Sequence, residues 1–223
     1  MTVVANPSIV TSGLVMCLDA GNPRSYIGSG TTVTDISGSG NNGTLTNGVS
    51  FVSSGTASYF NFDGIDDFIG LPINSSFNTP SISFEVWCRV SNRNDRHIVM
   101  VNWSGNSLEV NPDLSVTMYN WSSSGQLGAI TSAGAISWDT WVHLVGTYDN
   151  SAQTLYTYVN GSLSASRSST PSTSYGVSVH KISGTDFGGQ ILGRLSIGRH
   201  YNFALSAAEV TQNFNAFRGR YGI

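Results

Sequence analysis

Short runs of alternating apolar and polar residues, separated by clusters of turn residues, fill most of this 223-residue chain. Such alternation puts every second side chain on the same face of a β-strand, whereas helical periodicity is nearly absent before the C-terminal segment. In the segment SISFEVWCRV at 81–90, Phe84 and Val86 point to one face, and Glu85 and Trp87 point to the other. Many short strands joined by turn clusters predict an all-β sandwich or barrel.

The alternating runs predict strands along the whole chain. They lie at residues 13–18, 59–62, 67–69, 81–90, 97–103, 107–111, 114–121, 141–148, 155–159, 162–167 and 190–201, with a further short strand around 44–45. Asp63-Gly64 and Asn160-Gly161 each join two of these runs. Dipeptides of this kind are the strongest short-range signal for a β-hairpin, because both turn residues need a positive φ. We therefore predict hairpins at both places.

The C-terminal segment predicts one short helix over about residues 206–218. Ser206 is a good N-cap, and Glu209 stands three residues later, which is the pattern of a capping box. Gly219 is the residue type that commonly ends a helix. We expect the apolar side of this helix to pack on the edge of the sandwich.

The chain is poor in charge: Asp, Glu, Lys and Arg make up 10% of it, against about 25% in ordinary globular proteins. The formal net charge is −3, and Lys181 is the only lysine. No basic stripe is present to neutralise phosphates, so nucleic-acid binding is disfavoured. Low charge also weakens the usual protection against association between exposed strand edges, so we expect the domain to pack against a partner.

Residues 1–12 are predicted to be an extended N-terminal arm, and residues 13–223 a single domain. The arm carries Val3, Val4, Ile9 and Val10. We expect it to lie on a neighbouring subunit or another protein of the same assembly. Its sequence lacks the basic and long apolar regions of a secretion signal, and no stretch approaches the roughly 20 apolar residues of a membrane-spanning helix.

The two cysteines, Cys17 and Cys88, match no zinc-binding spacing. Cys88 lies within an apolar run, where a buried thiol behaves as a small hydrophobic side chain. We predict two buried free thiols.

Four segments together resemble the laminin-G-like branch of the concanavalin A-like lectin/glucanase superfamily. They are YFNFDGIDDFIGLP at 59–72, SISFEVWCRV at 81–90, WDTWVHLVGTYDNSAQTLYTYVNGSL at 138–163 and LSIGRHYNFALSAAEVTQNF at 195–214. The resemblance covers about residues 13–223. It implies a concanavalin-like jelly-roll β-sandwich of two antiparallel sheets.

The two ends of the domain carry a narrower resemblance. Residues 12–48 and the terminal NFNAFRGRYGI are similar to virion structural proteins of tailed bacteriophages, where such a domain occurs in fibres, tail appendages or capsid decorations. This implies a non-enzymatic protein displayed on the virion, assembled in the cytoplasm of the bacterial host. Its partners would be other virion proteins, further copies of itself in a homo-oligomer such as a trimer, and glycans of the host surface. The alternative is a free-standing carbohydrate-binding lectin for host adhesion.

Because the superfamily includes glucanases, hydrolysis is a third hypothesis, and the sequence disfavours it. Glycosidases need two carboxylates about 5–9.5 Å apart, and in the family's glucanases these follow an E-x-D-x-E pattern on one strand. The three glutamates here are Glu85, Glu109 and Glu209, and none has an acidic residue two positions away. We therefore predict no catalytic residues.

The acidic cluster of Asp63, Asp66 and Asp67 admits two interpretations. Calcium takes six to eight oxygen ligands from carboxylates and backbone carbonyls held in a turn, and the family resemblance implies such a site at a rim of the sandwich. The alternative is a hairpin turn in which the aspartates cap backbone amides. No cofactor is required by either interpretation.

Two Asn-Trp-Ser triplets are the candidate glycan-binding residues. Asn102 and Trp103 end one predicted strand, and Asn120 and Trp121 end another. An exposed indole can stack on the C–H face of a sugar while a neighbouring amide binds its hydroxyls. The alternative is that both tryptophans plug the ends of the sandwich.

Overall fold

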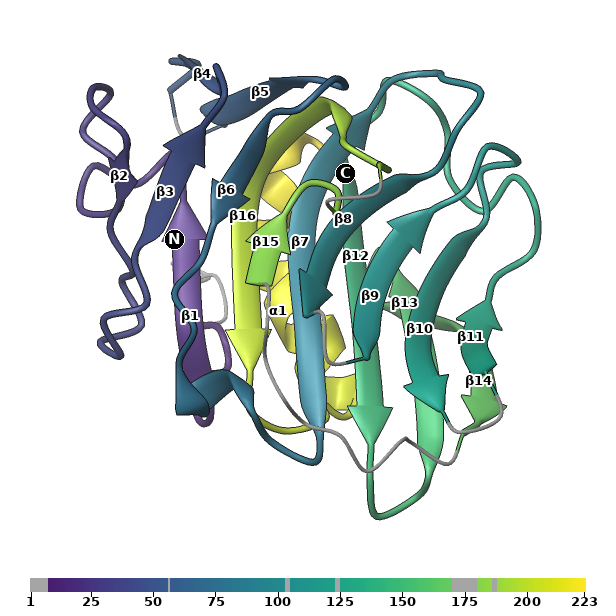
Figure 1. Cartoon of the computed structure of the whole chain (residues 1–223). Coiled ribbons are helices and arrows are strands. Elements are labelled where there is room, and N and C mark those ends of the chain that lie inside the picture. Colours follow the sequence, from purple (N-terminus) through teal and green to yellow (C-terminus); the bar gives the residue numbers. More distant parts are fainter. Residues whose placement is uncertain (1–7, 56, 103–104, 123–124, 170–179, 186–187) are drawn as a thin grey trace, which may run out of the picture.

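The computed structural model describes residues 8–223, apart from residues 56, 103–104, 123–124, 170–179 and 186–187. Two antiparallel sheets stack face to face, and one helix covers the outer side of the rear sheet in Figure 1. The predicted all-β jelly roll of two antiparallel sheets with a C-terminal helix is confirmed. Each predicted strand is present within about two residues of its expected bounds.

The first sheet, called sheet A below, has eight strands among the described residues. Their bounds are β1 Leu14–Asp19, β4 Ser50–Val52, β5 Tyr59–Asp63, β7 Ile82–Val90, β12 Val142–Asp149, β13 Thr154–Val159, β14 Ser162–Ser168 and β16 Leu192–Tyr201. They follow the order β14-β13-β12-β7-β16-β5-β4, and β1 pairs with the second half of β16.

The second sheet, sheet B, also has eight strands in the part of the chain that the structure describes. Their bounds are β2 Thr32–Val33, β3 Gly43–Thr46, β6 Phe68–Gly70, β8 His97–Asn102, β9 Asn106–Val110, β10 Val116–Ser122, β11 Gly125–Ile130 and β15 His180–Ile182. They follow the order β11-β10-β9-β8-β15-β6-β3-β2. A short 3₁₀ helix, η1 Ser75–Phe77, lies between β6 and β7.

The core lies between the two sheets, and the alternation in β7 shows how the sequence builds it. Phe84, Val86 and Cys88 are completely buried in the cluster between the sheets. Glu85 and Trp87 point to the other face of β7 and are equally buried, because the helix covers that face. Both faces of β7 are therefore inside the protein.

The segment after β5 corrects one prediction. Asp63-Gly64 does not join a hairpin, because β5 pairs with β4 and β16 in sheet A, whereas β6 pairs with β3 and β15 in sheet B. Residues 63–67 instead carry the chain from one sheet to the other. Alternation shows that a segment is a strand but does not identify the strand it pairs with, so a crossover and a hairpin look alike in the sequence.

The second predicted hairpin is confirmed. β13 and β14 pair across Asn160 and Gly161, both of which have positive φ, 48° and 79°. A side chain at Gly161 would come within 2.8 Å of the ring of Phe214 on the helix. Glycine is therefore required here by the turn and also by the close approach of the helix.

The helix, α1 Ala207–Tyr221, begins as predicted and ends about one turn later than predicted. Ser206 and Glu209 form the capping box. Gly219 remains helical, and Gly222 provides the left-handed cap, with φ 74°. The last turn is held because the ring of Tyr221 stacks on Trp87 at a centroid distance of 4.3 Å.

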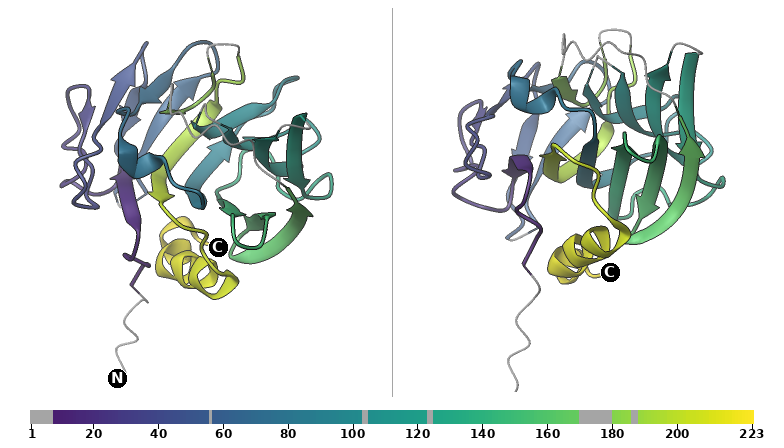
Figure 2. Two further views of the ribbon diagram at one scale, coloured as in Figure 1. Left: turned by 60° about the horizontal axis from the view of Figure 1, so that its bottom comes forward. Right: turned by 90° about the horizontal axis from the view of Figure 1, so that it is seen from below.

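Helix α1 forms a second apolar layer with the outer face of sheet A, and Figure 2 shows it packed against that side of the sandwich. Trp87 and Ile197 of the sheet meet Tyr221, Phe214 and Phe217 of the helix. Among the described residues α1 is the only α-helix, and no described helix is long and apolar enough to cross a membrane.

Val10, which belongs to the predicted arm, packs on its own domain. Val10 is buried beside Leu205 and Val210. Its amide donates to Asn213 Oδ1 at 2.8 Å, and the hydroxyl of Tyr201 donates to its carbonyl at 3.2 Å. Contacts with the domain therefore begin before residue 13, where the sequence predicted the domain to start. An anchoring role of the arm stays a prediction for residues 1–7, which lie outside the described residues.

Cys17 and Cys88 are both buried and free, as predicted. Burial raises the pKa of the Cys88 thiol to about 12. It therefore remains a neutral thiol at physiological pH.

Three histidines are buried as neutral side chains. His180 of β15 and His200 of β16 contact each other, with 3.3 Å between ring nitrogens, and both pack on the ring of Phe77. Burial lowers the pKa of His180 to about 3 and that of His97 to about 4, and it also lowers the pKa of His200 well below its ordinary value. All three groups resist protonation in the folded state.

These histidines predict a loss of stability in mild acid. Above the unfolded-state pKa of about 6.5 they are neutral in both states and do not affect folding. Below it the unfolded chain binds protons that the folded chain does not, which costs about 1.4 kcal/mol per pH unit for each group. The raised pKa values of Glu109 and Asp67 act in the opposite direction. We expect the free energy of unfolding to fall by about 2–4 kcal/mol between pH 6 and pH 5.

Urea unfolding at pH 7.5, 6 and 5 measures this dependence. A free energy of unfolding that stays constant or increases from pH 6 to pH 5 would contradict the burial of neutral histidines.

Candidate functional site

Glu85, on the central strand β7, is one of the three glutamates considered above as a possible catalytic carboxylate. Its Oε1 accepts from Arg199 Nη1 at 2.5 Å and lies 3.1 Å from His143 Nε2. Its Oε2 accepts from Asn213 Nδ2 at 2.7 Å. Glu85, Arg199 and His143 are all at most 1% exposed. Helix α1 covers the whole group, so the carboxylate does not reach solvent.

The charge of Glu85 is held by its surroundings. Burial by itself would raise its pKa, but the guanidinium of Arg199 and the hydrogen bonds from His143 and Asn213 outweigh burial and lower the pKa to about 2. Glu85 therefore carries a permanent negative charge with every oxygen occupied. A general acid for glycoside hydrolysis needs a raised pKa and an open path to the substrate, and Glu85 has neither.

The other two glutamates are also held in structural contacts. Glu109 accepts from Ser107 Oγ at 2.6 Å and from Arg96 Nη1 at 3.3 Å. Glu209 accepts from the amide of Ser206 at 2.8 Å as part of the capping box. The structure thus brings no two glutamates together in one site.

The three aspartates of the acidic cluster lie close together in the structure. Asp63, Asp66 and Asp67 each offer one carboxylate oxygen within 4.8 Å of the others. Some of their oxygens cap backbone amides: Asp63 Oδ1 accepts from Ile65 N at 2.8 Å, and Asp67 Oδ2 accepts from Asp63 N at 3.0 Å. The turn interpretation therefore describes part of the geometry.

Asp67 also shows the feature expected of a cation ligand. It is 3% exposed, and its Oδ1 has no hydrogen-bond partner. Burial and the charges of Asp63 and Asp66 raise its pKa. A divalent cation would relieve this repulsion and supply the missing partner, so the three aspartates fit a calcium site in the crossover between the two sheets.

The asparagines of the two Asn-Trp-Ser triplets lie on the two strands that flank β9 in sheet B. Asn102 of β8 and Asn120 of β10 both pair with Asn106 of β9, so three asparagines form a row across one end of sheet B. The amide of Asn120 donates to Asn106 Oδ1 at 2.9 Å, and that of Asn102 donates to the carbonyl of Phe77 at 3.3 Å.

The structure describes the asparagine side chains of these triplets but not the tryptophan side chains. Asn102 and Asn120 are each 3% exposed, so their amides stabilise the end of the sandwich. Trp103 lies outside the described residues, and of Trp121 only the backbone is described, within β10. A role of the two indoles in glycan binding stays a prediction.

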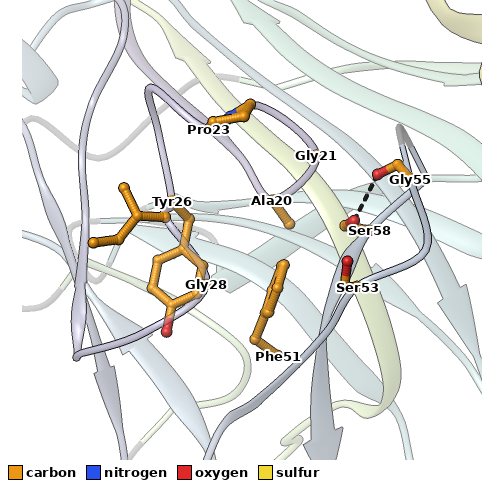
Figure 3. Close-up of a pocket in the computed structure, with 10 residues that line it drawn as sticks. Ala20, Gly21, Pro23, Tyr26, Gly28, Phe51, Ser53, Gly55 and Ser58 are labelled. Carbon is orange, nitrogen blue, oxygen red and sulfur yellow. Dashed lines mark hydrogen bonds between the residues drawn. The ribbon is translucent and has the colours of Figure 1, made fainter.

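Sequence reasoning did not nominate the loop of residues 20–31 between β1 and β2, called the β1–β2 loop below. A hollow of about 210 Å³ lies between this loop and the chain around β4, and Tyr26, Phe51, Ser53 and Ser58 are among its lining residues. Figure 3 shows the rings of Tyr26 and Phe51 close together, with Ser53 and Ser58 beyond Phe51.

Two further hollows adjoin the same loop. One of about 260 Å³ lies on its outer side and is lined by Arg24, Ile27 and hydroxyl-bearing residues. The other, of about 490 Å³, lies between the loop and the C-terminal end of α1, where Arg220 forms a bidentate ion pair with Asp19 at 2.7 and 2.9 Å. The sequence signal that marks this region is its run of Gly, Ser and Thr, which also describes an ordinary loop.

The acidic cluster generates a prediction about metal binding. We expect millimolar calcium to raise the melting temperature relative to chelator, because a ligand that binds only the folded state stabilises it by about 2.7 kcal/mol at a hundred times its dissociation constant. The variant Asp67→Asn should lose the response.

The matched control is Asp95→Asn, which removes an exposed carboxylate outside the cluster and should respond like the wild type. Identical melting curves of the wild type in calcium and in chelator would reduce the cluster to a capped turn.

Comparison with solved structures shows the same fold in proteins of low sequence identity. The binding domain of Paraclostridial Mosquitocidal Protein 1 matches 92% of this chain and 52% of its own, with a TM-score of 0.72 and 19% identity. The receptor binding domain of botulinum neurotoxin C/D mosaic serotype matches with 0.69 and 15%, over 92% of this chain and 51% of its own. Trypanosoma rangeli sialidase matches with 0.69 and 13%, over 95% of this chain and 35% of its own.

The chain therefore spans about half the length of the two toxin domains and about a third of the sialidase. No curated protein matches the sequence. The family model for the concanavalin A-like lectin/glucanases superfamily matches residues 62–211, which is most of the chain and overlaps all four segments that carry the resemblance. This chain belongs to the concanavalin A-like lectin/glucanase superfamily.

Proposed function

We propose that this chain is a non-enzymatic, carbohydrate-binding jelly roll displayed on a bacteriophage particle. The observation that carries the proposal is the use of all three glutamates in structural contacts, above all the burial of Glu85 with Arg199 beneath α1. A member of a lectin and glucanase superfamily whose glutamates are all engaged in structural contacts is best suited to binding. The hollows around the β1–β2 loop, lined by aromatic and hydroxyl-bearing residues, support the same class of function.

The similar toxin domains are described as binding and receptor-binding domains, which supports recognition of a surface. At such low sequence identity the similarity supports only a shared fold. The ligand class proposed here is therefore argued from the chemistry of this chain. Its surface has few charges and many hydroxyls and amides. Such groups bind by hydrogen bonds, which suits neutral hydroxyl-rich polymers.

Display on a virion is proposed from the resemblance of residues 12–48 and of the C-terminal segment to structural proteins of tailed bacteriophages. In this proposal the particle is assembled in the host cytoplasm, where the free Cys17 and Cys88 remain reduced. Residues 1–7 contact other virion proteins, the domain associates with copies of itself in a homo-oligomer such as a trimer, and the jelly roll faces outward toward host-surface glycans.

The proposal predicts binding without turnover. We expect the purified chain to be retarded in native gels that contain a polysaccharide, with laminarin, mannan, agar and carrageenan as probes. We expect no reducing ends to be released from the same polymers, because all three glutamates are held in structural contacts. In purified phage particles, mass spectrometry should find the chain at a fixed copy number.

Release of reducing ends that disappears in Glu85→Gln would refute the non-enzymatic assignment. Retardation by a polysaccharide, together with absence from purified particles, would instead favour the free-standing lectin. A chain that no polysaccharide retards would contradict carbohydrate binding.

A further inference from the structure

The hollow between the β1–β2 loop and β4 is fixed before any ligand binds. Ser25 Oγ accepts from the amide of Asp19 at 3.0 Å and donates to the carbonyl of Thr34 at 2.7 Å, which closes the base of the loop. The hydroxyl of Tyr26 donates to the carbonyl of Gly30 at 2.7 Å. A loop held in this way loses little conformational entropy when it binds a ligand.

One wall of the hollow is aromatic and rigid. The ring of Tyr26 lies 5.0 Å from that of Phe51 and 5.2 Å from that of Phe60, centroid to centroid. Phe51 packs on the main core and is only partly buried, so part of its ring remains open to the hollow. Rigid aromatic surfaces contribute large contact area at a low cost in entropy.

Another part of the lining is polar and uncharged. Ser53 is exposed, and Ser58 Oγ donates to the carbonyl of Gly55 at 2.6 Å, as Figure 3 shows. A sugar ring has two apolar C–H faces and an equatorial rim of hydroxyls. Aromatic and hydroxyl-bearing side chains that line one hollow match both parts of such a ring.

The adjoining outer hollow extends this surface in one direction. It is lined by the exposed hydroxyls of Ser29, Thr31 and Thr32. Arg24 supplies the only charged side chain in the lining of these two hollows, and a guanidinium binds carboxylate or sulfate groups as readily as it donates to hydroxyls. The side chains that line the two hollows therefore suit a neutral or anionic polysaccharide.

Ile27 marks the ridge between the two hollows. It lines both of them and is 81% exposed, the highest value among the large hydrophobic residues that the structure describes. Single exposed apolar residues are common on protein surfaces. Ile27 differs because it stands next to an aromatic wall and between two hydroxyl-lined hollows, where an apolar ridge would lie under a chain of sugar rings.

We infer that the hollow formed by Tyr26, Phe51, Ser53 and Ser58, together with the Ile27 ridge, binds successive sugar rings of a neutral or anionic polysaccharide. This inference rests on the proposed carbohydrate-binding function and assigns it to a site distinct from Trp103 and Trp121. The triplet Asn120-Trp121-Ser122 lies at the end of sheet B. The hollow instead lies beside β4, the edge strand of sheet A.

The test uses affinity electrophoresis of the full chain in laminarin and mannan, which are neutral, and in carrageenan, which carries sulfates. Ser53→Trp fills the hollow from an exposed position, and we expect it to weaken binding to the retarding polysaccharide at least tenfold. Ile27→Ala should weaken it roughly threefold. Retardation by carrageenan alone would identify an anionic ligand, and retardation by laminarin or mannan a neutral one.

The matched controls are Ser39→Trp and Ile73→Ala, which make the same changes at exposed positions outside both hollows. They should bind like the wild type, and urea unfolding of all four variants confirms that each is folded. Unchanged binding in Ser53→Trp, with loss of binding in Trp121→Ala, would overturn the inference and leave carbohydrate binding intact. A wild-type chain that none of the three polymers retards would overturn both.

Discussion

The ion pair between Glu85 and Arg199 is the interaction on which the outer layer of this protein depends. Two charges removed from water are stable only when they face each other and their remaining hydrogen-bonding groups are satisfied. Arg199 lies on β16, and the second carboxylate oxygen of Glu85 reaches Asn213 on α1. Asn213 in turn accepts from the amide of Val10. One buried charge pair thus joins the centre of sheet A, the C-terminal helix and the N-terminal segment.

This arrangement decides which surfaces are free to bind a ligand. The outer face of sheet A is covered by α1 and its aromatic contacts with Trp87, so the glutamate in the middle of the sheet serves stability. The hollows instead surround the β1–β2 loop, at the edge where the short strand β4 ends sheet A. Binding residues on loops that a rigid scaffold positions are a common solution, and a family that includes both lectins and glucanases can separate binding from hydrolysis in this way.

The long strands and the helix could be predicted from the sequence, because their patterns are local. Alternation over nine residues defines β7, and Ser206 with Glu209 defines the start of α1. Strands β2, β4, β11 and β15 were not predicted. Three of them have only two or three residues, and β11 is rich in glycine, so they exist because neighbouring strands offer backbone partners.

Contacts between residues far apart in the sequence could not be predicted, and these contacts determine where a ligand can bind. Nothing near Glu85 in the sequence indicates Arg199 or Asn213, which lie more than a hundred residues away. The crossover at Asp63-Gly64 has the dipeptide of a hairpin, although its two strands belong to different sheets. The triplets did not indicate that Asn102 and Asn120 both pair with Asn106 and are buried, because strand pairing and sandwich packing determine both features. Tyr26 and Phe51 meet only because the β1–β2 loop folds over β4.

The substitution Glu85→Gln tests the central claim most directly, because it keeps the shape of the side chain and removes its charge. Arg199 would then be buried without a counter-charge, which costs about 3–5 kcal/mol. Glu109→Gln, whose partner Arg96 is half exposed, serves as the comparison and should cost less. The account predicts that Glu85→Gln loses that much free energy of unfolding in urea, while its folded fraction is retarded by polysaccharide like the wild type. A variant as stable as the wild type that no longer binds polysaccharide would contradict it, because Glu85 would then belong to a binding site.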